Sequence, residues 1–301
     1  SSSYLTLTIL ILRYVFNPQL KVFELLSQVD EILVILQLSR NTEDWKYEFV
    51  IFPSTVLIAQ PLWSIFLERS ATKVILVNYT AMAEPLSPKL SKVVDGMWHL
   101  SSWKDIWVVD DYQATQMDLT SKSTAINYTN IGVPHWSGRI FNPPQNSGLQ
   151  YVAVFDTHIR SNQIFTAGVV DEMGWNDPRL EEDFISTVLQ ATSHLDLVVL
   201  HKKKRKVPQM QQTKVDEMTQ KLKLIYGDKY QVVDETFSAV SLIDLSIAAV
   251  SKPISTTAFV ATEMLKPSII LDPTMNVQTY DPGLRGCKLA YNREQLLEIL
   301  K

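Results

Sequence analysis

Three hydroxyl residues in a row, Ser255-Thr256-Thr257, stand where a helix is expected to begin just after a buried strand. The apolar run Leu245 to Val250 predicts the strand, and Ala258 to Leu265 has helical character. The first N–H groups of a helix have no partner within the helix and lie at the positive end of its dipole. Such a position can bind a phosphate, but it is also an ordinary place for a helix cap. Both interpretations are open from the residues alone.

Two carboxylates stand at the ends of predicted strands. Asp156 follows the apolar run Leu149 to Phe155, and Glu84 follows the strand predicted for Lys73 to Tyr79. A carboxylate in such a position can act as a general acid or base, or as a nucleophile. The alternative is a capping aspartate and a solvated loop glutamate.

Cationic residues follow the same strand ends. His158 and Arg160 share the loop after Asp156, where a cation can bind a carboxylate or a phosphate. His201 and Lys202 end another apolar run and begin a basic stretch, 202–206. The basic stretch fits a nuclear-import signal, a surface that attracts an anionic ligand or lipid, or a solvated loop. We assign His201 and Lys202 to binding of an anionic ligand and leave the rest as surface or membrane contact.

Several common signatures are absent. The chain has no G-x-G-x-x-G and no G-x-x-x-x-G-K-[ST], which argues against a dinucleotide dehydrogenase and a P-loop enzyme. It has no C-x-x-C, no closely spaced histidine pair and no Asp-x-Asp. We therefore expect neither a zinc site nor a carboxylate-held catalytic metal.

The 301 residues are enough for two domains. Strands and helices alternate, which predicts parallel sheets. A polar, Pro-rich run from Phe141 to Gly148 divides the chain, so we expect an N-terminal domain over 1–141 and a C-terminal domain over 149–301. The predicted fold class is α/β, with two Rossmann-like domains facing a cleft.

The expected strands are Leu5–Leu12, Glu31–Leu38, Tyr47–Pro53, Lys73–Tyr79, Ile106–Val109, Thr124–Ile131, Leu149–Phe155, Leu195–Leu200, Tyr230–Val233, Leu245–Val250 and Ser268–Asp272. Helices are expected at Pro18–Gln28, Ser54–Arg69, from Asp177-Pro178 to about Leu195, around Val215–Ile225, at Ser238–Ile243, Ser255–Leu265 and Asn292–Leu300.

Composition limits the partners and the compartment. The net charge of −4 gives no general attraction to nucleic acid. The single cysteine, Cys287, excludes an internal disulfide framework and fits a reducing compartment. Leu5 to Leu12 is too short to span a membrane. We expect a cytoplasmic protein that can also lie peripherally at the inner face of the membrane.

Four segments resemble two-domain glycosyltransferases of the GT-B type. Ile131-Gly132-Val133-Pro134-His135 looks like their "iGvP" segment. Ser255-Thr256-Thr257, followed by Lys266-Pro267-Ser268-Ile269-Ile270, resembles "SS…EAL…GKPVI". Val198 to Lys202 is similar to the "vvKpHP" segment of bacterial capsule and Kdo transferases, and Asn292 to Leu300 matches their closing helix. The resemblance covers Lys73 to Lys301 and is strongest in the second domain.

This resemblance implies a transferase that moves a sugar onto a surface glycan or glycolipid, with CMP-Kdo and CMP-sialic acid the nearest donors and Kdo the expected sugar. Because the metal-ligand patterns are absent, we expect neither a metal nor a cofactor. The resemblance also implies Asp156 as nucleophile and Glu84 as acid/base, as in a retaining mechanism. The donor-binding residues would be His158, Arg160, His201, Lys202, Ser255, Thr256, Thr257 and Glu263.

The chain departs from the family pattern at two places. The usual Glu of "EAL" aligns with Val260, and Glu263 lies about one turn later. The proline after the histidine is missing, because Lys202 follows His201. Two alternatives therefore stand beside the transferase: a nucleotide-sugar epimerase of the same architecture, and a non-catalytic glycan- or nucleotide-binding module of a larger synthase.

Overall fold

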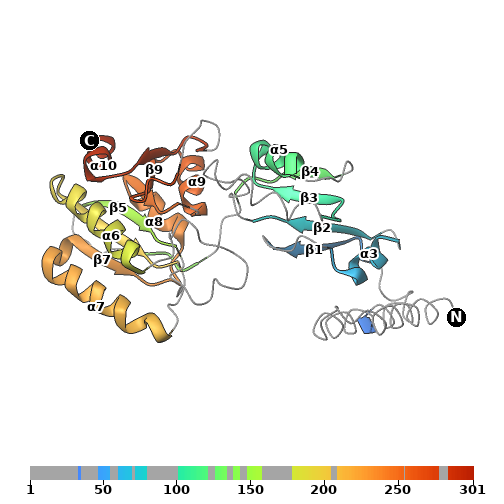
Figure 1. The fold of residues 1–301 in the computed structure, drawn as a ribbon, viewed down its shortest axis with the longest axis horizontal. Coiled ribbons are helices and arrows are strands. Elements are labelled where there is room, and N and C mark those ends of the chain that lie inside the picture. Colours follow the sequence, from blue (N-terminus) through green and yellow to red (C-terminus); the bar gives the residue numbers. More distant parts are fainter. Residues whose placement is uncertain are drawn as a thin grey trace. The chain divides into compact units, whose positions relative to one another are not determined.

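The chain divides into two compact units, each built on its own parallel sheet (Figure 1). The computed structural model describes residues 33–34, 47–54, 60–69, 72–79, 101–120, 126–133, 138–142, 148–157, 178–204, 209–253, 255–277 and 284–301. Ser1–Tyr79, Gly96–Val108 and Asp118–Asn130 form the N-terminal unit. Thr80–Asp95, Val109–Met117 and Ile131–Lys301 form the C-terminal unit.

The N-terminal unit contains a four-stranded parallel sheet in the order β1-β2-β3-β4. Val74, Ile75 and Leu76 in β2 are buried, as expected for an inner strand covered on both faces. Alternate side chains of β1 are exposed, as expected for an edge strand. The strands are β1 (Phe49–Pro53), β2 (Lys73–Val77), β3 (Asp105–Val108) and β4 (Asn127–Asn130), with helix α3 (Leu62–Arg69) before β2. Helix α5 (Asp111–Thr120) follows β3 in the chain, and its residues up to Met117 are grouped with the C-terminal unit.

The expectations for the first half of the chain are only partly correct. The strand predicted over Glu31–Leu38 is wrong where the structure describes it, because Leu33 and Val34 are helical. Helix α3 begins after Pro61, whose carbonyl accepts hydrogen bonds from the N–H and hydroxyl of Ser64. Helix α5 was not predicted because it has no apolar stripe. It begins where Asp110 accepts a hydrogen bond from the N–H of Gln113 at 2.7 Å. The elements predicted at 5–12 and 18–28 lie outside the described residues.

The C-terminal unit contains a six-stranded parallel sheet in the order β10-β9-β8-β5-β6-β7. Every side chain of β6, β8 and β9 is buried, which explains why these strands are continuous apolar runs rather than alternating ones. The strands are β5 (Gln150–Phe155), β6 (Leu197–Lys202), β7 (Tyr230–Val233), β8 (Ala248–Ser251), β9 (Ser268–Leu271) and β10 (Lys288–Ala290). Five of them correspond to predicted strands, and β10 was missed.

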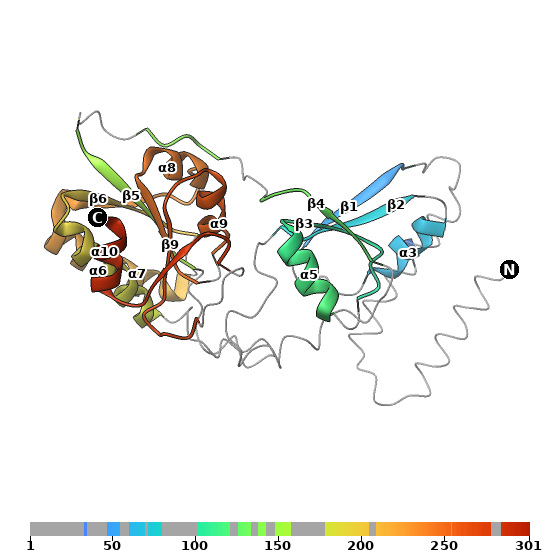
Figure 2. The ribbon, with the colours of Figure 1, turned by 90° about the horizontal axis from the view of Figure 1, so that it is seen from above.

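Helices cover both faces of this sheet (Figure 2). One apolar cluster joins the sheet to α6, α7 and α10, and a second joins it to α8 and α9. The helices are α6 (Pro178–Ser193), α7 (Gln209–Tyr226), α8 (Ala239–Leu245), α9 (Thr256–Glu263) and α10 (Arg293–Leu300). The α/β class with two Rossmann-like units is therefore confirmed. None of the helices that the structure describes has the length and apolar character needed to cross a lipid bilayer.

The parallel register brings the ends of three strands together. Phe155 at the end of β5 is level with Lys202 on β6 and with Ser251 on β8. The residues that follow or end these strands, Asp156, His201 and Lys252, therefore lie at one edge of the sheet. In open α/β sheets this carboxyl edge is where ligands bind.

The last helix begins after Asn292, as predicted, and its N-cap gives a first test. The side chain of Asn292 accepts a hydrogen bond from the N–H of Gln295 at 3.0 Å. Asn292→Ala should lower the free energy of unfolding by about 1 kcal/mol, because a helix N–H loses its partner. Urea unfolding followed by circular dichroism measures the change. Asn292→Asp, which keeps the acceptor, is the control, and equal stabilities of the two variants would contradict the capping role.

Candidate functional site

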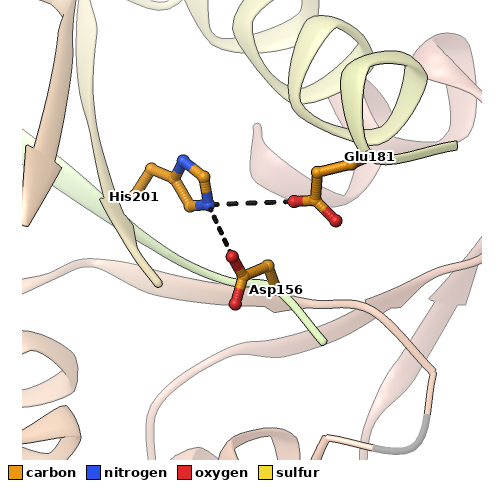
Figure 3. A group of neighbouring side chains, drawn as sticks. All are labelled: Asp156, Glu181 and His201. Carbon is orange, nitrogen blue, oxygen red and sulfur yellow. Dashed lines mark hydrogen bonds and ion pairs between the residues drawn. The ribbon is translucent and has the colours of Figure 1, made fainter. Parts of the chain in front are cut away.

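Four charged or titratable side chains gather at the carboxyl edge of the C-terminal sheet. Asp156 follows β5, His201 lies on β6, Lys252 follows β8, and Glu181 is in the first turn of α6. They are only 5%, 1%, 2% and 1% exposed, respectively. Buried charges must be paired with one another because water does not solvate them. We call these four residues the buried quartet; Figure 3 shows three of them.

His201 is the centre of the buried quartet. Its Nε2 lies 3.3 Å from Asp156 Oδ2 and 3.8 Å from Glu181 Oε1 (Figure 3). Its Nδ1 lies 2.9 Å from the hydroxyl of Tyr230, whose ring stacks on the imidazole. Burial raises the pKa of the Tyr230 hydroxyl, which therefore keeps its proton at neutral pH. Each imidazole nitrogen thus faces a polar partner inside the protein.

Glu181 and Lys252 form a buried ion pair. Lys252 Nζ donates to Glu181 Oε2 at 2.7 Å. Burial raises the pKa of Glu181, and the positive charge of Lys252 opposes this shift. The other oxygen, Glu181 Oε1, is buried and has no hydrogen-bond partner among the residues that the structure describes. The pair connects the start of α6 to the loop before α9.

Asp156 directly follows β5, as predicted, but its side chain is engaged inside the protein. Oδ1 accepts a hydrogen bond from the N–H of Lys204 at 2.6 Å, and Oδ2 faces His201. With both oxygens bonded and the side chain 6% exposed, the geometry favours a positioning role over nucleophilic attack. Asp156 fixes the loop after β6 against the end of β5.

The hydroxyl residues lie at the start of α9, as the sequence predicts. Ser255 is the N-cap, and its hydroxyl is 2.6 Å from that of Thr257. The Thr257 hydroxyl also lies 3.1 Å from that of Ser251 at the end of β8. These contacts hold the loop in shape. Thr256 is half-buried, and its hydroxyl has no hydrogen bond to any residue that the structure describes, so it is the member of the trio able to reach a ligand.

Lys202 ends β6 with its ammonium turned to backbone carbonyls. Nζ donates to the carbonyl of Glu235 at 3.1 Å and to that of Lys203 at 3.3 Å. Burial lowers the pKa of Lys202, and the nearby Asp156 opposes the shift. The ammonium therefore connects the ends of β6 and β7, which accounts for its burial without an anionic ligand.

Glu263, at the end of α9, contacts the segment that resembles "iGvP". Its Oε1 accepts a hydrogen bond from the N–H of Val133 at 3.1 Å. Gly132 precedes that N–H with a φ of 75°, a left-handed conformation that favours glycine. Val260, which aligns with the usual family Glu, is buried in the apolar cluster under α9. Glu263 thus anchors the entry into the C-terminal unit.

The remaining predicted site residues, Glu84, His158 and Arg160, lie outside the described residues. Conversely, the sequence did not indicate Glu181, Lys252 or Tyr230. Glu181 resembles an ordinary acidic residue in a first helical turn, and Lys252 an ordinary loop lysine. Only the sheet topology brings them together.

One group among the described residues has metal-ligand character. Asp156, Glu181 and His201 each offer one atom, and these atoms lie within 4.8 Å of one another. The sequence predicts no metal site because such predictions depend on closely spaced ligands. Here the ligand atoms come from three separate segments.

Breaking the buried ion pair of Glu181 should cost far more stability than breaking the exposed ion pair of its neighbour Glu182. Lys252→Met should lower the free energy of unfolding by about 3–5 kcal/mol, because Glu181 then lacks its compensating charge. The double variant Glu181→Leu with Lys252→Met should recover much of this loss. The control is Lys221→Met on α7. It breaks the exposed ion pair with Glu182, the residue next to Glu181 on α6, and should change the free energy of unfolding little. Chemical denaturation measures all three, and equal effects of Lys252→Met and Lys221→Met would contradict the pairing.

Comparison with solved structures supports the fold. A trehalose-phosphate synthase (UDP-forming) from Burkholderia vietnamiensis has a TM-score of 0.51 and 9% identity, with 94% of this chain covering 70% of the synthase. The corresponding protein from Burkholderia multivorans also has a TM-score of 0.51 and 9% identity, with coverages of 90% and 67%. A glycosyltransferase from Rickettsia africae reaches 15% identity at a TM-score of 0.46, with coverages of 94% and 72%. At these identities, the two synthases show the fold alone.

No curated protein sequence matches the chain significantly. A family model described as "Polysaccharide biosynthesis PFTS motif protein" matches residues 19–300. Because the match spans nearly the whole chain, this protein belongs to the family of polysaccharide biosynthesis PFTS motif proteins.

Proposed function

We propose that the protein is a glycosyltransferase that moves a sugar from a nucleotide-sugar donor to a growing polysaccharide or glycolipid. The observation that carries the proposal is the start of α9, where hydroxyl residues follow β8 at the carboxyl edge of a parallel sheet. Family membership in polysaccharide biosynthesis supports this class of reaction. Two Rossmann-like units are also the architecture of GT-B transferases.

The start of α9 would hold the donor phosphates. A sugar leaves its nucleotide as negative charge develops on the phosphate oxygen. Backbone N–H groups and the helix dipole stabilise that charge without needing to reorganise. The Thr256 hydroxyl adds a further donor, while Thr257 and Ser255 keep the loop in place.

This arrangement needs no divalent cation at the donor phosphates. We therefore expect the initial rate of transfer to be the same with and without added Mg²⁺ or Mn²⁺. The measurement is release of nucleotide under saturating donor and acceptor. A rate that rises many-fold on adding either ion would argue for a metal-bound donor and against the α9 site.

The proposed donor is CMP-Kdo, because Val198 to Lys202 is similar to a segment of Kdo transferases. A UDP-linked sugar is the competing donor. Glu84 is proposed as the acid/base, and His158 and Arg160 as contacts to the donor's carboxylate or phosphate. Asp156 is proposed as a positioning residue rather than as the nucleophile, because both of its oxygens are bonded within the protein.

Nucleotide titration tests the α9 site directly. Thr256→Val should weaken binding of the donor nucleotide about tenfold, because a hydrogen bond to a charged group is lost. Calorimetry with CMP and with UDP gives the affinity and identifies the preferred base. Thr262→Val is the matched control, because the Thr262 hydroxyl bonds to the carbonyl of Phe259 within the same helix. Equal affinities of the two variants would contradict the site.

Product analysis separates the transferase from its alternatives. A transferase releases nucleotide and extends the acceptor, whereas an epimerase returns an altered sugar without an acceptor. A binding module retains the donor unchanged. Either of the last two results would overturn the proposed transfer.

A further inference from the structure

The inner atoms of three buried side chains face one another in the C-terminal unit (Figure 3). His201 Nε2 lies 3.3 Å from Asp156 Oδ2 and 3.8 Å from Glu181 Oε1. Ligands bound tetrahedrally to Zn²⁺ at about 2.0–2.1 Å are about 3.3 Å apart. The separation from Asp156 matches this value, the separation from Glu181 is slightly larger, and all three atoms lie within 4.8 Å of one another.

The outer atoms of the same side chains are all held by other groups. His201 Nδ1 contacts the Tyr230 hydroxyl at 2.9 Å. Asp156 Oδ1 accepts the N–H of Lys204, and Glu181 Oε2 accepts from Lys252. Metal ligands are commonly oriented in this way, with a hydrogen bond to the atom that does not face the ion. The three inner atoms are left to converge.

One carboxylate oxygen lacks a partner at the point where the three atoms converge. Glu181 Oε1 is buried and accepts no hydrogen bond from the residues that the structure describes. A buried polar atom without a partner is costly, and a cation beside Oε1 would supply the missing contact.

We propose that Asp156, Glu181 and His201 bind a structural Zn²⁺ ion. An imidazole nitrogen with two carboxylates suits Zn²⁺, whereas Mg²⁺ and Ca²⁺ prefer oxygen ligands alone. The ion would join the end of β5, the first turn of α6 and β6, three segments that are far apart in the sequence. Its role is stability of the C-terminal unit, so the proposal does not depend on the transfer reaction.

Metal content and thermal stability test the site without any activity assay. Protein dialysed against a chelator and then against Zn²⁺ should retain one equivalent by elemental analysis. Its melting temperature should rise with Zn²⁺ concentration, because an ion that binds only the folded state stabilises it. The same concentration of Mg²⁺ should cause no rise.

Two neighbouring variants identify the ligands. Glu181→Gln should abolish the retained zinc and the thermal shift, because the anionic oxygen is lost. Glu182→Gln, at the next residue on the exposed side of α6, should keep both. Wild-type protein that is folded but retains no zinc would overturn the proposal. Equal zinc retention by the two variants would also overturn it. If Glu181→Gln does not fold, zinc retention by the wild-type protein decides.

Discussion

The ion pair between Glu181 and Lys252 is the constraint on which the proposed site depends. These residues are 71 positions apart and almost completely buried, with an N–O distance of 2.7 Å. Lys252 begins the loop that turns from β8 into α9, and Glu181 lies in the first turn of α6. The pair therefore fixes one end of the hydroxyl loop to the opposite helical layer. Because buried charges tolerate little displacement from their partners, the start of α9 has a defined position.

His201 and Asp156 extend this constraint across the sheet. Asp156 holds the backbone after β6, His201 holds Asp156, and Tyr230 holds His201 from the next strand. The polar network thus spans the ends of β5 and β6 and includes a side chain from the start of β7, next to the hydroxyl loop after β8. A preorganised edge of this kind suits a reaction whose main requirement is to stabilise charge on a leaving phosphate.

The strands of the C-terminal sheet, except β10, could be predicted from the sequence, but the arrangement of the site could not. Ser268–Leu271 is a strand, as predicted, because parallel strands covered on both faces are short apolar runs between turn residues. Helix α5 was missed because its residues carry no apolar period. The strand predicted over Glu31–Leu38 failed at Leu33 and Val34, since a short apolar run fits a helix equally well.

For the candidate site too, only the local features could be predicted from the sequence. Ser255, Thr256 and Thr257 could be found because a helix start is a local feature of the sequence. The pairing of Glu181 with Lys252, and the convergence of Asp156 and His201 on Glu181, follow from the strand order instead. No local pattern encodes that order, so neither the ion pair nor the metal-ligand geometry could be predicted. The hydrogen bond from Lys202, predicted to bind an anion, to the carbonyl of Glu235 likewise joins residues that are distant in the sequence.

The most direct test of the account is a crystal structure of the protein with CMP bound. We expect phosphate oxygens within hydrogen-bonding distance of the first N–H groups of α9 and of the Thr256 hydroxyl. The Glu181–Lys252 pair should remain intact beneath them. A nucleotide bound away from α9, with Thr256 contacting only protein, would contradict the central claim.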